Sequence, residues 1–162
     1  MVAAFVCAVV ALVLAGAVTG VFFAFSVSVL PGLDAIPAAQ AVPAMRSMNR
    51  KILVPPFLIS FTGTPIAAGL AGILLLVAGA LAPGVLFLAA AIIYAAGAVA
   101  PTATVNVPLN NSLDAAAPSG EDDAARVWAA FSPRWTRWNH LRTAASLIVV
   151  LLIGLGLYTW PA

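Results

Sequence analysis

Hydrophobic residues fill three long blocks of this chain, and charged residues occur only between them. Residues 1–33, 52–113 and 143–162 contain no charged side chain, and every Lys, Arg, Asp and Glu lies within 34–51 or 114–142. A membrane helix needs about 20 apolar residues to cross a hydrocarbon core roughly 30 Å thick. The first and last blocks therefore each predict one crossing.

The middle block is too long for a single crossing. Residues 52–113 would form a helix of roughly 90 Å at ~1.5 Å per residue, about three times the bilayer core. The block must turn back once, and Ala82-Pro83-Gly84 carries the strongest turn signal. The sequence thus predicts an all-α fold: a transmembrane four-helix bundle, a single integral membrane domain over 1–162, with crossings at about 3–29, 54–80, 85–107 and 134–158.

Composition supports this assignment. Hydrophobic residues make up 64% of the chain and charged residues 7%, whereas a soluble domain carries about 25% charged residues. No basic stretch precedes the first block, and its apolar run is about twice that of a signal peptide, so we expect it to be retained. The single Cys7 excludes an intramolecular disulfide.

The positive charges predict an orientation in the membrane. All seven Lys and Arg residues lie in or beside the loops that join the first crossing to the second and the third to the fourth. Cytoplasmic loops carry the excess of basic residues in membrane proteins. We therefore expect a multi-pass protein of the cell membrane, with both charged loops cytoplasmic and both termini outside.

Each charged loop is expected to contain a short interfacial helix. In the first loop, Pro43 can open a helix with Met45, Met48 and Ile52 on one face. That face would lie along the membrane surface.

In the second loop, Ser119 can cap a helix with an acidic first turn and an apolar stripe toward the bilayer or the mouth of the bundle. The stripe comprises Ala124, Val127, Trp128 and Phe131. Ser132-Pro133 would then begin the last crossing.

Two further patterns lie within the crossings. Pro101 and Pro108 fall late in the third crossing and should kink or end its helix. Gly16 and Gly20 form a small-xxx-small pattern on the first crossing, which would allow close packing on a neighbour, including a homo-oligomer.

Polar residues gather at the cytoplasmic end of the last crossing. Trp135, Asn139, Arg142 and Ser146 recur at helical spacing and share one face. Trp138 lies four residues before Arg142 and can stack on its guanidinium. His140 is displaced from this face.

The other helices place candidate residues at the same level. They are Asn106, Asn110 and Asn111 at the end of the third crossing, Asn49 in the first loop, and Phe23 and Ser26 at the end of the first crossing. By topology, polar groups from all parts of the bundle converge at one mouth. Buried amides in a membrane are costly unless paired, so this convergence needs an explanation.

One explanation is structural. Tryptophan belts, snorkelling arginines and asparagine caps are common at helix ends, and His140 could be a structural histidine. These roles do not require Asn139 and His140 inside a helix, or three asparagines within 106–111. The alternative is a pocket for a flat aromatic or quinone-like molecule that becomes anionic, reached from the lipid or the cytoplasm.

Other chemistries find little support. One histidine, one cysteine and carboxylates confined to loops do not supply an ordinary metal-ligand set, so we expect no metal. A haem held by His140 would lack a second ligand. The chain has no glycine-rich nucleotide loop and too few basic residues for nucleic-acid binding. We expect no bound cofactor.

Four motifs resemble a known family. FFAFSVSVLPGL, AMRSMNR, NVPLNNSL and RWTRWNHLRT occur in this order over nearly the whole chain. Together they resemble the anthrone-oxygenase-like family of small bacterial and fungal membrane proteins, much of which is described only as a domain of unknown function. The resemblance marks Asn49, Asn106, Pro108, Asn110, Asn111, Trp138, Asn139, His140 and Arg142.

The resemblance implies a reaction. Fungal members act in polyketide pathways and oxidise anthrones to anthraquinones. In a monooxygenase reaction of this kind, His140 would take the acidic C–H proton, Arg142 would stabilise the enolate, and Asn139 and Asn110 would hydrogen bond to the peroxide. O2 would be the co-substrate, without metal or flavin.

A non-enzymatic role stays open at this stage. The chain could be an accessory subunit, a scaffold or a small lipophile-binding protein, in which the polar cluster is a structural clamp. The sequence alone leaves the substrate, the oligomeric state and catalysis itself undecided.

Overall fold

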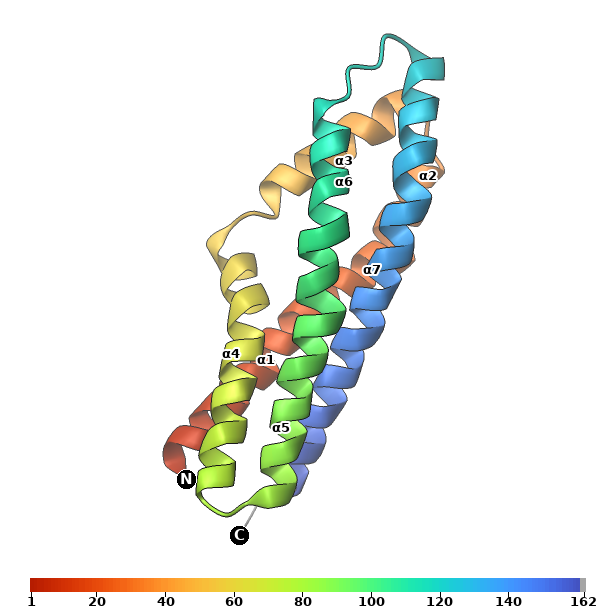
Figure 1. Ribbon diagram of the computed structural model, residues 1–162. Helices are drawn as coiled ribbons and strands as arrows, with labels where there is room; N and C mark the ends of the chain where they lie inside the picture. The colour runs from red at the N-terminus through yellow and green to blue at the C-terminus, as the bar shows by residue number, and fades with distance from the viewer. Residues whose placement is uncertain (161–162) are drawn as a thin grey trace.

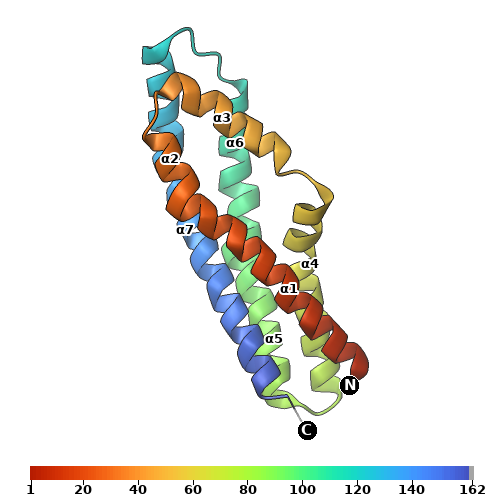
Figure 2. The ribbon, with the colours of Figure 1, turned by 180° about the vertical axis from the view of Figure 1, so that it is seen from behind.

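The fold is an antiparallel bundle of four long helical segments. The computed structural model describes residues 1–160. Four of its helical segments are long and apolar enough to cross a membrane: Val2–Asp34, Pro55–Val77, Leu81–Ala115 and Glu121–Tyr158. They run alternately up and down, so both termini lie at one end of the bundle (Figures 1 and 2). The predicted all-α four-helix fold is confirmed; the last two residues of the predicted domain lie outside the described part.

Two of the long segments contain more than one element. The first comprises α1 (Val2–Ala24), the π-helical segment η1 (Phe25–Val29) and α2 (Leu30–Asp34). The second is α4 (Pro55–Val77). The third comprises α5 (Leu81–Tyr94), the π-helical segments η2 (Ala95–Val99) and η3 (Thr102–Asn106), and α6 (Val107–Ala115). The fourth is α7 (Glu121–Tyr158), and α3 (Ala38–Lys51) lies between the first two.

The turn in the middle block lies earlier than predicted. The chain reverses at 78–80, where Gly79 has a φ of +79° that favours glycine. Pro83 lies in the first turn of α5, where its missing N–H costs little. Gly84 serves close packing instead of the turn, because a Cβ there would lie 2.7 Å from the Leu76 side chain.

The third segment stays helical past its prolines, so the predicted end of the helix at this point is wrong. It continues through η2 and η3 to Ala115, and Pro101 lies between the two π-helical segments. A proline has no N–H to donate, and a local shift to i→i+5 hydrogen bonds lets the helix pass it. Asn106 and Asn110 therefore belong to one continuous helical segment.

The predicted start of the last crossing at Ser132-Pro133 is also wrong. α7 begins at Glu121 and runs through Pro133, so the described residues of the second loop contain no separate interfacial helix. Ala129 and Pro133 are both exposed, so the carbonyl that loses its donor lies on the outer side of α7. Gly120, not Ser119, is the N-cap; the Ser119 N–H donates to Asp123 at 3.2 Å.

α3 packs on the other helices through the face of Met45, which was predicted to rest on the membrane surface. Met45 is fully buried in a second hydrophobic core with Val42, Leu113 and Trp128. Glu121 caps α3 by accepting hydrogen bonds from the backbone N–H groups of Ala38 and Ala39, with N···O distances of 2.8 and 3.3 Å. α3 therefore closes over one end of the bundle, which we call the polar end (Figure 2).

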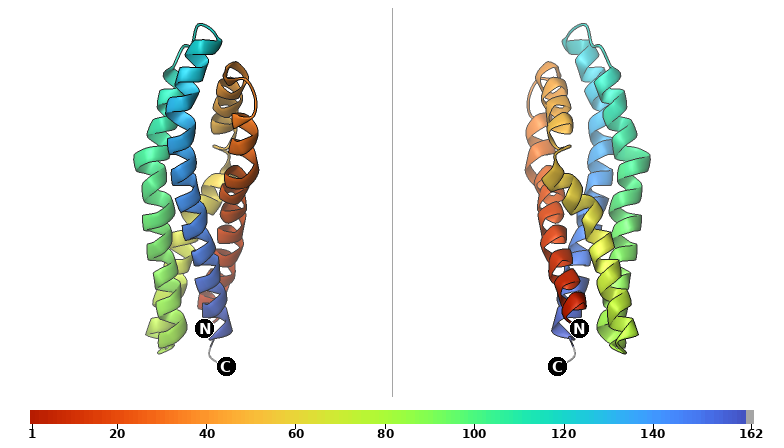
Figure 3. Two further views of the ribbon diagram at one scale, coloured as in Figure 1. Left: turned by 90° about the vertical axis from the view of Figure 1, so that its right-hand side faces the viewer. Right: turned by 90° about the vertical axis from the view of Figure 1, so that its left-hand side faces the viewer.

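The short length of α4 leaves a gap in the bundle at the polar end. α4 begins at Pro55, whereas α6 and α7 continue well beyond that level (Figures 1 and 3). The chain before Pro55 is not helical from Leu53, and α3 crosses above it. The fourth corner of the bundle is therefore covered only by α3 and its link to α4.

The opposite end is packed through small residues. Alanines of α1 and α4 form the main core with Phe87 and Tyr94 of α5. Gly16 and Gly20 do not take part, since a Cβ at either would meet nothing within 4 Å. Both glycines lie on the exposed face of α1, and a homo-oligomer stays a prediction.

Candidate functional site

A cavity of about 380 Å³ occupies the gap at the polar end. All four spanning segments and α3 contribute to its lining. Seven of the residues predicted for the site line it: Asn49, Asn106, Asn110, Asn111, Trp135, Asn139 and Arg142. The structure therefore brings the amides and the guanidinium together at one end of the bundle.

Arg142 lies at the inner end of the cavity. Its side chain is buried, with 5% of the residue exposed. The guanidinium carbon lies 4.5 Å from the centre of the Phe22 ring and 5.0 Å from that of Trp135. Such contacts stabilise a cation whose water has been removed.

The guanidinium is not neutralised by a carboxylate. Nη2 donates to Oδ1 of Asn139 at 2.8 Å, and Nη1 donates to Oγ1 of Thr102 at 3.1 Å. Nε has no partner. The two ion pairs found within residues 1–160 join other side chains. A buried charge without a counter-ion is costly, so this end of the cavity favours an anion.

Asn139 holds Arg142 in place. It is fully buried, and its Nδ2 donates to the Phe22 carbonyl at 2.9 Å and to Ser26 Oγ at 2.8 Å. Its Oδ1 accepts from Arg142. Both N–H bonds are thus used within the protein, which leaves Asn139 no donor for a bound molecule.

Ser26 completes this network behind the cavity. Since Ser26 Oγ accepts from Asn139, its own hydroxyl donates to Thr143 Oγ1 at 2.9 Å. Thr143 in turn donates to the Asn139 carbonyl at 2.9 Å. Ser26 was predicted to bind substrate, but it is buried and does not line the cavity.

A close approach between η2 and α7 brings Arg142 to Thr102. A Cβ on Gly97 would lie only 2.4 Å from the Ala145 Cβ. Arg142 is one helical turn before Ala145, and Thr102 follows Gly97 by five residues. Glycine at 97 therefore allows the two helices to come close enough for the hydrogen bond between Arg142 and Thr102.

The asparagines of η3 and α6 differ in the hydrogen-bonding groups that they leave free. Asn106 is buried, and its Nδ2 donates to the Trp135 carbonyl at 3.3 Å while its Oδ1 has no partner. Asn110 Oδ1 accepts from Trp135 Nε1 at 2.8 Å. Trp135 is held from both sides and packs on Phe25, with ring centres 5.6 Å apart. The cavity thus has a fixed aromatic wall beside a free amide oxygen.

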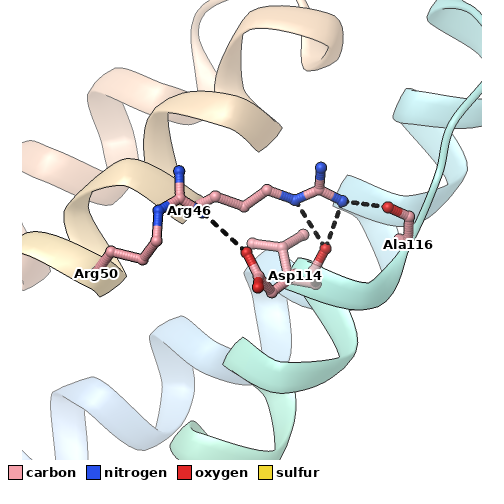
Figure 4. Close-up of polar contacts among 5 residues, drawn as sticks. Arg46, Arg50, Asp114 and Ala116 are labelled. Atoms are coloured by element: carbon pink, nitrogen blue, oxygen red, sulfur yellow. Dashed lines mark hydrogen bonds and ion pairs between the residues drawn. The ribbon is translucent and has the colours of Figure 1, made fainter.

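Polar contacts join α3 to α6 at the outer end of the cavity, and Figure 4 shows these contacts. Arg46 donates through Nε and Nη2 to the Leu113 carbonyl, at 2.9 and 2.6 Å, and also bonds to the Ala116 carbonyl. A cation at the C-terminus of a helix is favourable. Arg50 forms an ion pair of 3.0 Å with Asp114, and both side chains are mostly exposed. We call these four residues, Arg46, Arg50, Asp114 and Ala116, the clasp.

Besides Ser26, three predicted site residues do not line the cavity. His140 is exposed and lines a second cavity beside α2, together with Asp34 and Arg137. Phe23 is 50% exposed, whereas its neighbours Phe22 and Phe25 line the cavity. Trp138 is half-buried, and Arg142 packs on Phe22 and Trp135 instead of on Trp138.

The sequence did not identify several side chains that line the cavity, among them Phe22, Phe25, Thr102, Arg46 and Asp114. Phe22 and Phe25 belong to the FFAF motif, which was a signal, but the choice between Phe22 and Phe23 depends on helical phase. Thr102 and the clasp had no clear signal, because their partners are a distant guanidinium and backbone carbonyls.

The family model described as anthrone oxygenase matches residues 57–152. This range runs from the start of α4 to near the end of α7, more than half of the chain. It includes the asparagines of η3 and α6 and the buried face of α7. The chain belongs to the anthrone oxygenase family. Comparisons with curated proteins and with solved structures give no match.

The family match does not include the whole cavity. Phe22 and Asn49, which line it, and Arg46 of the clasp precede the matched range. In this member of the anthrone oxygenase family, the matched range supplies one part of the cavity lining, and the first segment and α3 supply the rest.

Proposed function

We propose that the protein is a membrane oxygenase that converts an anthrone-like polycyclic aromatic ketone to a quinone with O2, without a bound cofactor. The observation that supports this most is the buried Arg142 guanidinium, which has no carboxylate partner and lies in a cavity with aromatic walls. Membership of the anthrone oxygenase family agrees with it.

The substrate would bind with its carbonyl oxygen at Arg142. A flat ring system fits beside Trp135 and Phe25, and the free Oδ1 of Asn106 can accept a hydrogen bond from a ring hydroxyl. Leu53 and Val107 also line the cavity and are exposed, at 64% and 42%. This apolar rim favours entry of a lipophilic molecule from the bilayer.

Arg142 would promote loss of a proton from the carbon that lies opposite the carbonyl in the central ring. The electron pair of that C–H bond moves through the ring to the oxygen and forms an enolate. Its negative charge develops next to the guanidinium, where low polarity strengthens the attraction. The neutral ketone gains much less, so the interaction lowers the barrier instead of merely tightening binding.

The enolate can then react with O2 directly. One electron passes from the carbanion to O2, the two radicals combine, and a C–O bond forms. Protonation gives a hydroperoxide. Loss of the second proton from the same carbon breaks the O–O bond, forms the C=O group and releases water. One oxygen atom ends in the quinone and one in water, so no external reductant is needed.

Of the two amides predicted to contact the peroxide, Asn139 is replaced by Asn49 and Asn110 keeps its role. Asn139 was expected to bind the peroxide, but its donors are used by Phe22 and Ser26. Asn110 uses only its oxygen on Trp135, and Asn49 also lines the cavity. We assign the peroxide contacts to the amide groups of Asn110 and Asn49.

Oxygen uptake by the purified protein in lipid nanodiscs, with anthrone as the substrate, tests the proposal. The expected result is one O2 consumed per anthraquinone formed, with one atom of 18O2 in the new carbonyl. Arg142→Gln should lower kcat/KM by about 10²–10³-fold, as loss of an oxyanion donor does. Arg126→Gln, an exposed arginine outside the cavity, is the matched control.

Uptake no faster than the uncatalysed oxidation of anthrone would overturn the oxygenase proposal. Thermal stabilisation by anthraquinone without turnover would instead support the alternative, a lipophile-binding membrane module. Full activity of Arg142→Gln would overturn the role of the guanidinium.

A further inference from the structure

The proposed reaction needs a group that accepts a proton from carbon, twice in each turnover. His140, the predicted base, is outside the cavity. Among the described residues that line the cavity, Asp114 is the only one with a carboxylate or imidazole side chain. Water alone is a weak base, so the position of this carboxylate matters.

Asp114 and Arg142 lie at opposite ends of the cavity. Arg142 is at the buried inner end, whereas the Asp114 side chain is 59% exposed at the outer end. Asn106, Asn110 and Asp114 follow one another at four-residue intervals and thus lie on one face of the third segment. The backbone of Asp114 lies roughly 18 Å along this segment from Thr102, the hydrogen-bond partner of Arg142, at ~1.5 Å per residue.

The substrate itself spans this distance in part. In an anthrone, the carbonyl and the acidic CH2 group lie on opposite sides of the central ring. With the oxygen at Arg142, the CH2 group points toward the outer end of the cavity. A carboxylate there can take the proton through water that bridges the remaining distance.

From these positions we propose that Asp114 is the base that deprotonates the substrate, an inference that rests on the proposed function. Asp114 takes the first carbon proton through bridging water as the electron pair moves to the oxygen at Arg142. The carboxylic acid then returns that proton to the peroxide formed from O2. The regenerated carboxylate takes the second carbon proton as the O–O bond breaks, and its proton leaves with the departing hydroxide as water.

The clasp orients this carboxylate (Figure 4). Arg46 binds the carbonyls of Leu113 and Ala116, which lie before and after Asp114, and so fixes the last turn of α6. Arg50 holds one carboxylate oxygen at 3.0 Å. Exposure of the side chain lets it exchange its proton with water between turnovers. Asp114 is therefore both held in place and open to solvent.

The test compares variants of the full chain in nanodiscs. Asp114→Asn should lower kcat at least about 100-fold, the lower range for loss of a general base, while anthraquinone binds within about twofold of wild type. Added acetate should restore part of the rate in Asp114→Ala. We expect C–H cleavage to limit the rate. Anthrone deuterated at both CH2 positions should therefore react more slowly than unlabelled anthrone.

Two control variants separate catalysis from structure. Arg50→Gln removes the same ion pair but keeps the carboxylate, so it should lose far less activity than Asp114→Asn. Asp122→Asn removes an exposed carboxylate outside the cavity and should leave the rate unchanged.

Three results would overturn the inference. They are a wild-type rate in Asp114→Asn, equal losses in Asp114→Asn and Arg50→Gln, and no rescue of a folded Asp114→Ala by acetate. If Asp114→Asn fails to fold, the inference is tested by the rescue of Asp114→Ala with acetate and by the rate of Arg50→Gln. Failure of the proposed function looks different, because wild type itself then takes up no oxygen, and the inference is overturned with it.

Discussion

The guanidinium of Arg142 donates a 2.8 Å hydrogen bond to the side-chain oxygen of Asn139, one helical turn earlier in α7. Asn139 is anchored in turn to Phe22 and Ser26 of the first segment. The cation is thus held by an amide, which positions it without cancelling its charge. This arrangement keeps the positive charge available to a bound anion.

Asn139→Ala should destabilise the protein and weaken anion binding together. The change leaves Arg142 Nη2 unpaired, whereas Ser26 Oγ keeps its bond to Thr143 and the Phe22 carbonyl keeps a backbone N–H. Unpaired buried groups cost about 1–3 kcal/mol each, and somewhat less in membrane bundles. We expect a loss of about 1–3 kcal/mol, measured as a lower unfolding midpoint in detergent.

Asn111→Ala is the matched control for this change. Asn111 also lines the cavity, but it is exposed. Its replacement should move the midpoint very little. An unfolding midpoint of Asn139→Ala equal to that of the wild type would show that the hydrogen-bond network does not stabilise the site.

Gly97 and Ala145 should behave as a coupled pair. Gly97→Ala places two Cβ atoms 2.4 Å apart and forces η2 away from α7. Overpacking of this kind costs about 1–3 kcal/mol. The double variant Gly97→Ala, Ala145→Gly moves the methyl group to the other helix and should recover most of the stability and oxygen uptake.

A double-mutant cycle on the unfolding midpoints measures this coupling. Additive losses in the double variant would contradict close packing at this position. They would also remove the explanation for how Arg142 reaches Thr102.

The pattern of hydrophobic and charged residues predicted the architecture because strong physical constraints allow few alternatives for it. The charge-free blocks can be buried in lipid only as helices, and Trp135, Asn139, Arg142 and Ser146 share one helical face, as their burial confirms. The convergence of asparagines and Arg142 on one cavity then follows from antiparallel topology.

The site predictions that were wrong or missing depend on the helical phase of a side chain or on hydrogen bonds to backbone carbonyls. Asn139 is fully buried and His140 is exposed, although they are adjacent, because successive helical residues point about 100° apart. Topology sets the level of a residue in the bundle but not the direction of its side chain. Arg46 was missed because it binds main-chain carbonyls, which no residue type marks.

The orientation in the membrane stays a prediction from the positive charges. A single cysteine at Ser119, between α6 and α7, in a Cys7→Ser background should react with a membrane-impermeant maleimide only after the cells are permeabilised. A cysteine at Gly79, in the turn at the other end, should react in intact cells. The reverse pattern would place the polar end outside the cell.

The central claim is that Arg142 stabilises an anion in the cavity, and the ionisation of a bound chromophore measures this most directly. 2-Hydroxyanthraquinone changes colour when its hydroxyl ionises, so its pKa can be titrated on the protein in nanodiscs. A neighbouring guanidinium should lower that pKa by about 1–3 units relative to the free dye, and Arg142→Gln should abolish the decrease. A pKa unchanged or raised on the wild-type protein would contradict the account.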